Sequence, residues 1–145
     1  MEEVRHVLQL ITRRFGFLNK NCCSVDGADV SLTQSHILYE IDRLSRPSMQ
    51  QIADALGMDI TTFSRQIQTL VRKKLVKKTP SDQDRRVYIL ELTTEGKMVS
   101  AAIEQRVKDY LTQIFSHMNE FEKETVIRSL KLLNACMEKT GVCCG

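Results

Sequence analysis

The stretch SMQQIADALGMDITTFSRQIQTLVRKKLVKKT, residues 48–79, decides the fold of this chain. Ser48 precedes an amphipathic segment and Gln51 follows three residues later, a spacing typical of a capping box at a helix start. Gly57 is placed to end that helix, and Asp59 is placed to cap the next one by accepting from exposed backbone N–H groups. The stretch therefore predicts two helices joined by a tight turn that contains glycine.

The second of these helices has two unlike sides. Apolar residues at helical spacing predict a side that packs on a core. These are Ile60, Phe63, Ile67, Leu70 and Val71. The opposite side has donors, acceptors and cations but no carboxylate, and it comprises Thr61, Thr62, Arg65, Gln68, Thr69 and Arg72. Such a side suits the major groove of DNA, where arginine pairs with guanine, threonine meets a thymine methyl and phosphates repel acidic groups. The alternative is an ordinary solvated helix face.

The continuation PSDQDRRVYILEL, residues 80–92, predicts a turn and the return strand of a β-hairpin with a charged tip. Alternate residues of the return strand should share one inward face. They are Tyr88, Leu90 and Leu92. Arg85 and Arg86 would stay at the tip, where an arginine can enter a narrow minor groove. Asp84 is expected to orient a neighbouring arginine, the alternative being a surface ion pair of little energetic consequence.

Three parts of the chain resemble the MarR family of winged-helix transcription regulators: the helix pair with its flanks from Leu32 to Lys78, SDQDRR at residues 81–86, and LTTEGK at residues 92–97. One departure is Lys74, where members commonly carry glycine. A residue other than glycine at this position must avoid or tolerate a positive φ.

The resemblance implies a mainly α fold with a small β-wing, in which a winged helix-turn-helix lobe is flanked by N- and C-terminal helices that form a homodimerisation region. We expect one domain over residues 1–145, with the DNA-binding lobe at residues 31–94 and dimerisation helices at residues 1–22 and 95–140. The implied activity is regulation of transcription, most simply by a repressor that an effector releases from DNA.

Basic charge is concentrated on the expected DNA-binding lobe. Residues 65–86 hold eight lysines and arginines against two aspartates, although the net charge of the whole chain is only +3. This distribution is the electrostatic footprint of a nucleic-acid partner. We expect the DNA contacts to come from these residues: Ser48, Gln50, Thr61, Thr62, Arg65, Gln66, Gln68, Thr69, Arg72, Lys77, Arg85 and Arg86.

Helical periodicity also marks both ends of the chain. Apolar residues follow it from Glu2 to about Lys20. Further helices are expected to begin at Ser31 or Thr33, at Thr94 and at Asn119. Because neither terminal helix can bury its apolar stripe alone, we expect a two-fold homodimer. Such a dimer presents two recognition helices about 34 to 36 Å apart to a pseudo-palindromic duplex. The alternative is a monomer whose terminal helices fold onto the central lobe.

Five cysteines in two clusters are one candidate for the input of such a regulator. They are Cys22, Cys23, Cys136, Cys143 and Cys144. If the clusters meet in space, their thiolates would suit a thiophilic metal or metalloid ion, or a redox pair. Neither pair has the Cys-x-x-Cys spacing of a strong metal motif, and Cys136 could equally be a small core residue. No other cofactor is expected.

A second candidate input is a small aromatic or anionic ligand in a cleft between the dimerisation helices and the winged lobe, with the effector itself unspecified. Its expected border is Phe15, His36, Tyr39 and Arg43. For His36 and Tyr39 ordinary packing or solvent exposure is the preferred interpretation. A function of another class is a winged-helix module that binds protein and carries a thiol metal site.

Other function classes find little support in the chain. We find no Gly-rich phosphate loop, nucleophile elbow, His-rich metal helix or convincing carboxylate pair, so catalysis is not expected. No run approaches the roughly 18 apolar residues of a membrane span. The acidic start MEEVRH lacks the basic segment of a secretory signal, so we expect a cytoplasmic protein without a membrane partner.

Overall fold

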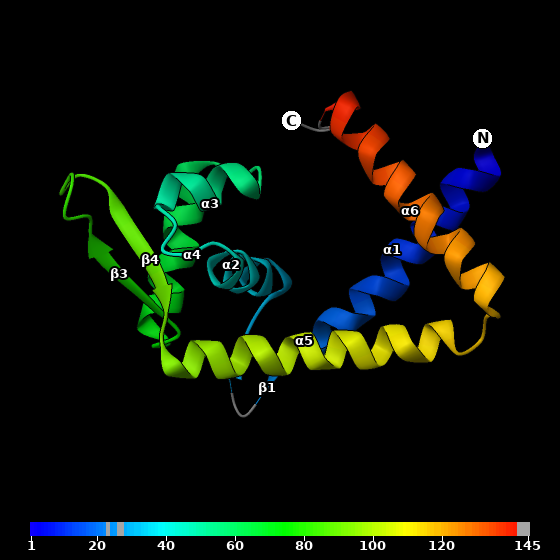
Figure 1. Cartoon of the computed structure of the whole chain (residues 1–145), viewed down its shortest axis with the longest axis horizontal. Helices are drawn as coiled ribbons and strands as arrows, with labels where there is room; N and C mark the ends of the chain where they lie inside the picture. The colour runs from blue at the N-terminus through cyan, green and yellow to red at the C-terminus, as the bar shows by residue number, and fades with distance from the viewer. Residues whose placement is uncertain (23, 26–27, 142–145) are drawn as a thin grey trace. The chain divides into compact units, whose positions relative to one another are not determined.

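The fold is mainly helical with a small β-wing, as predicted (Figure 1). A computed structural model describes the backbone of residues 1–22, 24–25 and 28–141, and the side chains of residues 1–15 and 29–141. Its elements are α1 (Glu2–Cys22), β1 (Ser24–Val25), β2 (Ala28–Asp29), α2 (Leu32–Arg43), α3 (Met49–Ala55), α4 (Ile60–Arg72), β3 (Val76–Pro80), β4 (Tyr88–Leu92), α5 (Thr94–Phe115) and α6 (Glu120–Thr140). The chain divides into two compact units, Met1–Val107 and Lys108–Gly145.

The predicted helix starts are confirmed by their caps. Ser48 accepts from the backbone N–H of Gln51 at 3.1 Å, while its own N–H donates to the Gln51 side chain at 2.8 Å. Ser31 caps α2 and Asn119 caps α6 with the same reciprocal arrangement. These bonds satisfy N–H groups that have no partner inside a helix, which is why such short sequence signals place the helix starts.

The core of the first unit lies under α2, α3, α4 and β4. Its fully buried large side chains are Val30, Ile37, Leu38, Ile52, Phe63, Ile67, Leu70 and Leu90. Val99 and Ile103 of α5 are also buried. The inward stripe predicted for α4 is therefore confirmed at its centre, by Phe63, Ile67 and Leu70.

Three residues predicted to face inward are exposed instead. Ile60 and Val71, at the two ends of α4, are 42% and 39% exposed. Both lie at the edge of the stripe formed by Phe63, Ile67 and Leu70 and at the two ends of the helix, where the core does not cover them. Tyr88 is 40% exposed because it pairs with Pro80 at the far end of the hairpin, beyond the core.

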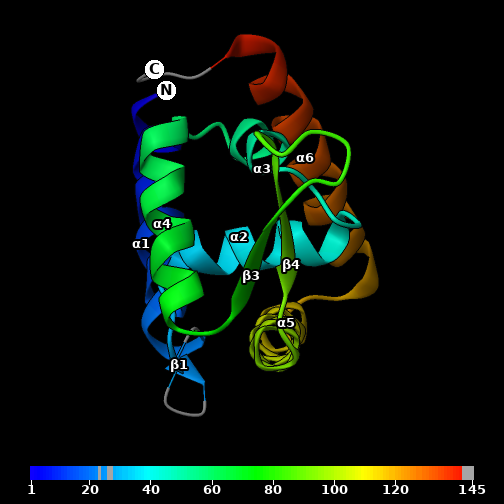
Figure 2. The same ribbon diagram turned by 90° about the vertical axis from the view of Figure 1, so that its left-hand side faces the viewer.

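The wing is an antiparallel hairpin of β3 and β4, which pair from Val76 with Leu92 to Pro80 with Tyr88. The segment before α3 runs along β4, since the Leu90 N–H donates to the Pro47 carbonyl at 2.9 Å. Figures 1 and 2 show α4 beside this hairpin. The wing is therefore bonded to the segment that leads into α3 and lies beside α4, so it contacts both helices of the helix-turn-helix.

The turn after α4 is tied to the start of α5. Lys74 adopts a positive φ of 63°, and its carbonyl accepts from the Thr93 hydroxyl at 2.7 Å. The same hydroxyl oxygen accepts from the Gly96 N–H at 2.9 Å. A Cβ at Gly96 would lie 2.0 Å from the Leu75 carbonyl oxygen, so only glycine permits this approach. The Leu-Thr-Thr-Glu-Gly sequence is thus a docking site for the end of α4.

The terminal helices keep their apolar side chains exposed in the single chain. On α1 they are Val4, Val7, Leu8, Ile11 and Phe15, and on α6 they are Phe121, Leu130, Leu132, Leu133 and Met137. Among the described residues, no helix is long and apolar enough to cross a membrane.

We predict that Lys74→Gly will be more stable than Lys74→Ala by about 0.5 to 1 kcal/mol, although both remove the same charge. Alanine keeps the steric cost of a positive φ, whereas glycine removes it. Glycine also raises the conformational entropy of the unfolded chain, which cancels part of the increase in the free energy of unfolding. Urea unfolding at equal protein concentration measures the difference. Equal midpoints for the two variants would show that Lys74 does not hold a left-handed conformation.

Candidate nucleic-acid interface

The outward side of α4 carries five exposed polar residues, which we call the recognition face. They are Thr61, Thr62, Arg65, Gln68 and Arg72. Within the part of the chain that the structure describes, the side chains of Arg65, Gln68 and Arg72 make no hydrogen bond or ion pair. Thr69, also predicted to contact DNA, is half-buried and its hydroxyl donates to the Arg65 carbonyl at 3.2 Å.

The start of α4 is held by its cap. One carboxylate oxygen of Asp59 accepts from the backbone N–H groups of Thr61 at 3.1 Å and Thr62 at 3.2 Å. The positive end of the helix dipole also stabilises this carboxylate. Its negative charge is therefore partly neutralised beside the recognition face, which itself has no acidic residue.

A shallow depression opens on the same helix. Its lining is Ile60, Thr61, Ser64, Arg65 and Gln68. Ile60 and Ser64 were not predicted as site residues, because the sequence pattern assigned Ile60 to the core. Only the structure shows that an aliphatic side chain borders the recognition face.

The predicted contacts at the start of α3 are partly engaged within the chain. Ser48 is half-buried and its hydroxyl oxygen serves the α3 capping box. Gln50 is exposed, and its amide donates to the Asp54 carboxylate at 2.8 Å.

Gln66 belongs to a buried polar network that sequence reasoning missed. Its amide oxygen accepts from the amide of Gln34, a residue of α2 that is only 7% exposed. The Gln34 oxygen accepts from the Ser31 N–H at 3.1 Å and lies 3.5 Å from Lys73 Nζ. Lys73 Nζ also donates to the Asp29 carbonyl. The network joins α2 to Gln66 within α4 and to Lys73 at its C-terminal end. It therefore fixes the orientation of α4 relative to α2.

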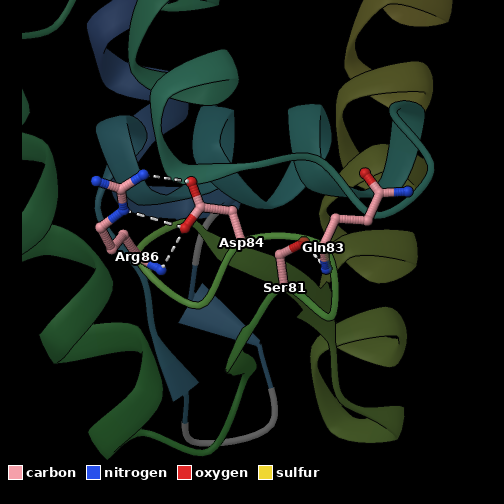
Figure 3. A network of polar contacts seen from close by, with 4 residues as sticks. All are labelled: Ser81, Gln83, Asp84 and Arg86. Carbon is pink, nitrogen blue, oxygen red and sulfur yellow. Dashed lines mark hydrogen bonds and ion pairs between the residues drawn. The ribbon is translucent and has the colours of Figure 1, made fainter.

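In the wing, Asp84 holds the side chain of Arg86 (Figure 3). Asp84 accepts from the backbone N–H of Arg86 at 3.0 Å and from its guanidinium at 3.2 and 3.3 Å. The Arg86 guanidinium, followed by its backbone N–H, lowers the pKa of the Asp84 carboxyl below its usual value. Arg85 and Lys77 are exposed, and neither side chain has a hydrogen bond or ion pair among the described residues.

A cavity of about 290 Å³ lies inside the first unit. Its lining is Phe15, Leu32, Ser35, His36, Tyr39, Ser100, Ile103, Glu104 and Val107. Three of the four residues predicted to border a ligand cleft are present, and Arg43 is not. Arg43 instead donates through Nε and Nη2 to one carboxylate oxygen of Glu40, one turn earlier on α2, at 3.1 and 2.8 Å. The sequence pattern did not link Arg43 to this neighbouring acid.

The thiol site stays a prediction. Cys136 is exposed on α6, whereas Cys23, Cys143, Cys144 and the side chain of Cys22 lie outside the described residues. Among the residues that the structure does describe, no three His, Cys, Asp or Glu side chains are placed to hold a metal ion.

Comparison with known proteins agrees with this geometry. A model described as the MarR family matches residues 28–87, from β2 into the wing. YybA of Bacillus subtilis (strain 168), an uncharacterised HTH-type transcriptional regulator, is 23% identical over 142 residues, covering 96% of this chain and 91% of YybA. These matches support a winged-helix transcription regulator of the MarR family, a class of protein that binds DNA and is not enzymatic.

Solved structures share the whole fold. FabT of Streptococcus pneumoniae, crystallised in complex with DNA, superimposes with a TM-score of 0.88 at 22% identity over 97% of this chain and 99% of FabT. MepR of S. aureus, solved as a MepR–DNA complex, gives a TM-score of 0.77 at 21% identity over 92% of this chain and 97% of MepR.

We predict that Gln34→Met, which is similar in shape but apolar, will lower the free energy of unfolding by about 1 to 3 kcal/mol. The substitution removes two hydrogen bonds of the buried Gln34, to the Gln66 side chain and to the Ser31 N–H, and each such bond contributes about 0.5 to 1.5 kcal/mol. Gln50→Met is the matched control, because Gln50 is exposed and water replaces its bond to Asp54. Equal urea midpoints for the two variants would contradict the prediction.

Proposed function

We propose that this MarR-family protein is a homodimeric repressor that occupies a pseudo-palindromic operator until an effector changes the spacing of its two lobes. The single observation that carries the proposal is the recognition face of α4, which is exposed and free of carboxylates, and whose Arg65, Gln68 and Arg72 side chains have no hydrogen-bond or ion-pair partner among the described residues. The wing, whose tip carries Arg85 and Arg86, lies beside α4 (Figure 2).

The chemistry of this surface suits each part of a duplex. In the major groove, Arg65 and Gln68 are of the types that pair with guanine and adenine. Arg72 and Lys77 are exposed cations that can contact phosphates, which position a protein without reading sequence. Arg85 suits an adjacent minor groove, where negative potential is strongest. The likeness to FabT and MepR, both solved with DNA, supports this arrangement.

Two observations support the homodimer. The apolar stripe of α1 is exposed in the single chain, with Val4, Leu8 and Ile11 about half accessible. On α6, Phe121 is 77% exposed and no residue is buried. Contiguous apolar surface of this kind is costly in water and marks an interaction site. A second copy of the chain would cover both stripes and pair two recognition helices.

We predict that Arg65→Ala and Lys77→Ala will weaken DNA binding in different ways. Arg65→Ala should lose about 1 to 3 kcal/mol of discrimination at one base pair, because it removes a base contact. Lys77→Ala should weaken all duplexes alike and lower the slope of log affinity against log salt by about 1. Anisotropy titrations compare a duplex selected from a random pool with a scrambled one at several salt concentrations.

Lys131→Ala is the matched control, since it removes the same charge from an exposed position on α6. The sedimented complex should contain two chains per operator duplex. Purified protein that binds no duplex at low ionic strength would overturn the proposal and favour a protein-binding module.

For the input, one specific observation favours a small ligand. The cavity of the first unit is lined by Phe15, Tyr39 and other apolar groups with His36 at its edge, a chemistry that fits a small aromatic molecule. Sensing of a thiophilic ion or an oxidant by the cysteines is the other proposal.

The two inputs are separated by a variant in which all five cysteines are replaced by serine. If the cavity is the input site, we predict that this variant will still be released from its operator by the same aromatic compounds as the parent, and that Ser35→Phe, which fills the cavity, will not. If release by a thiophilic ion or an oxidant is lost in the cysteine-free variant, the thiols are the sensor. Operator titration in the presence of each compound measures both.

A further inference from the structure

Ile60 is the one aliphatic side chain in the depression on α4. It is the first residue of the helix and 42% exposed, and it shares the depression with Thr61, Ser64, Arg65 and Gln68. A single exposed isoleucine is unremarkable on a protein surface. Its position among the polar groups of the recognition face is what calls for a chemical explanation.

Helix geometry places Ile60 at the edge of that face. Ile60 and Ser64 are one turn apart, on the flank between the buried line of Phe63 and Ile67 and the exposed line of Arg65. The two Asp59 bonds to Thr61 and Thr62 hold this first turn in helical form. The Ile60 side chain is therefore presented next to Arg65 by a fixed backbone.

The major groove offers one apolar partner for such a side chain. Each base pair presents donors and acceptors there, and thymine adds its C5-methyl group. The first residues of a recognition helix are those that reach the base edges. The polar groups of the groove can bond to the polar lining of the depression, Thr61, Ser64, Arg65 and Gln68. Against those same polar groups, an isoleucine side chain would displace water and form no hydrogen bond in return.

We propose that Ile60 is a specificity-determining residue that contacts a thymine methyl beside the base pair read by Arg65. The inference rests on the proposed binding of α4 in the major groove. Burying one methyl-sized group contributes about 0.8 kcal/mol, which corresponds to about a fourfold change in affinity. Ile60 thus adds a preference for thymine that hydrogen bonds alone do not supply.

Val71 provides a matched control. It is 39% exposed on the same helix, close to the value for Ile60, but it lies in the last turn and does not line the depression. Val71→Ala therefore removes a similar apolar surface from α4 without touching the proposed contact.

The test replaces each thymine of one half-site by deoxyuridine, which lacks only the C5-methyl group. The duplex is first selected from a random pool with the unaltered protein. At one position, we predict that deoxyuridine will weaken binding about fourfold for the parent, Ile60→Val and Val71→Ala. The same change should leave Ile60→Ala unaffected, because its methyl contact is already lost. Circular dichroism checks that each variant is folded.

Two outcomes would overturn the inference alone: selected duplexes that bind tightly with no thymine effect anywhere, or thymine effects of equal size in Ile60→Ala and the parent. Failure to select any duplex would instead overturn the proposed function and this inference together. Ile60→Val guards the result, since it retains an apolar group at the position even if Ile60→Ala disturbs the first turn of α4.

Discussion

The presentation of the recognition helix depends on how α4 ends. Lys74 takes a left-handed conformation, and its carbonyl is bound by Thr93 at the start of α5. The Thr93 N–H also donates to the Leu75 carbonyl at 3.1 Å, and Gly96 allows the two backbones to approach. Because β3 begins at Val76, this junction sets the direction of the wing as well as the end of α4. The recognition face and the wing are therefore placed by the same few hydrogen bonds.

The elements that place α4 also line the cavity of the first unit. On α2, Gln34 bonds to Gln66 of α4, while its neighbours Ser35 and His36 border the cavity. On α5, Gly96 packs on the turn after α4, and two turns later Ile103 borders the same cavity. A molecule that moved α2 against α5 would strain the two contacts that hold α4, namely the bond from Gln34 to Gln66 and the packing of Gly96 on the turn after α4. Tightly packed interfaces tend to move between discrete arrangements, so a small displacement at the cavity has a physical route to the recognition face.

Local signals in the sequence predicted the order of the helices and of the wing strands, and most helix starts, but not the short β1 and β2 strands. Capping pairs such as Ser48 with Gln51 act over three residues, and the glycine after α3 takes its positive φ without help from distant residues. At Lys74 the sequence left open whether the chain avoids or tolerates a positive φ, and the structure shows that it tolerates one.

What the sequence could not predict depends on residues far apart along the chain. Gln34 and Gln66 are 32 residues apart, and no periodicity connects them. The exposure of Ile60 and Tyr88 depends on where the core stops, which periodicity within one element does not reveal. The predicted place of Arg43 at the cavity was wrong: Arg43 does not line the cavity and pairs with Glu40 of its own helix.

The two wing arginines are chemically equivalent but are placed for different tasks. Asp84 holds the Arg86 side chain in a defined direction, and its negative charge offsets part of the positive charge of the Arg86 guanidinium. Since Arg86 lowers the pKa of Asp84, the carboxylate stays ionised at all but acidic pH, and the pairing is lost only as pH falls through that lowered pKa. Arg85 is exposed, and its side chain has no hydrogen bond or ion pair among the described residues. In the proposed complex, a restrained arginine would shape the tip while an unrestrained one could follow the local width of a groove, so Asp84 would serve geometry and not attraction.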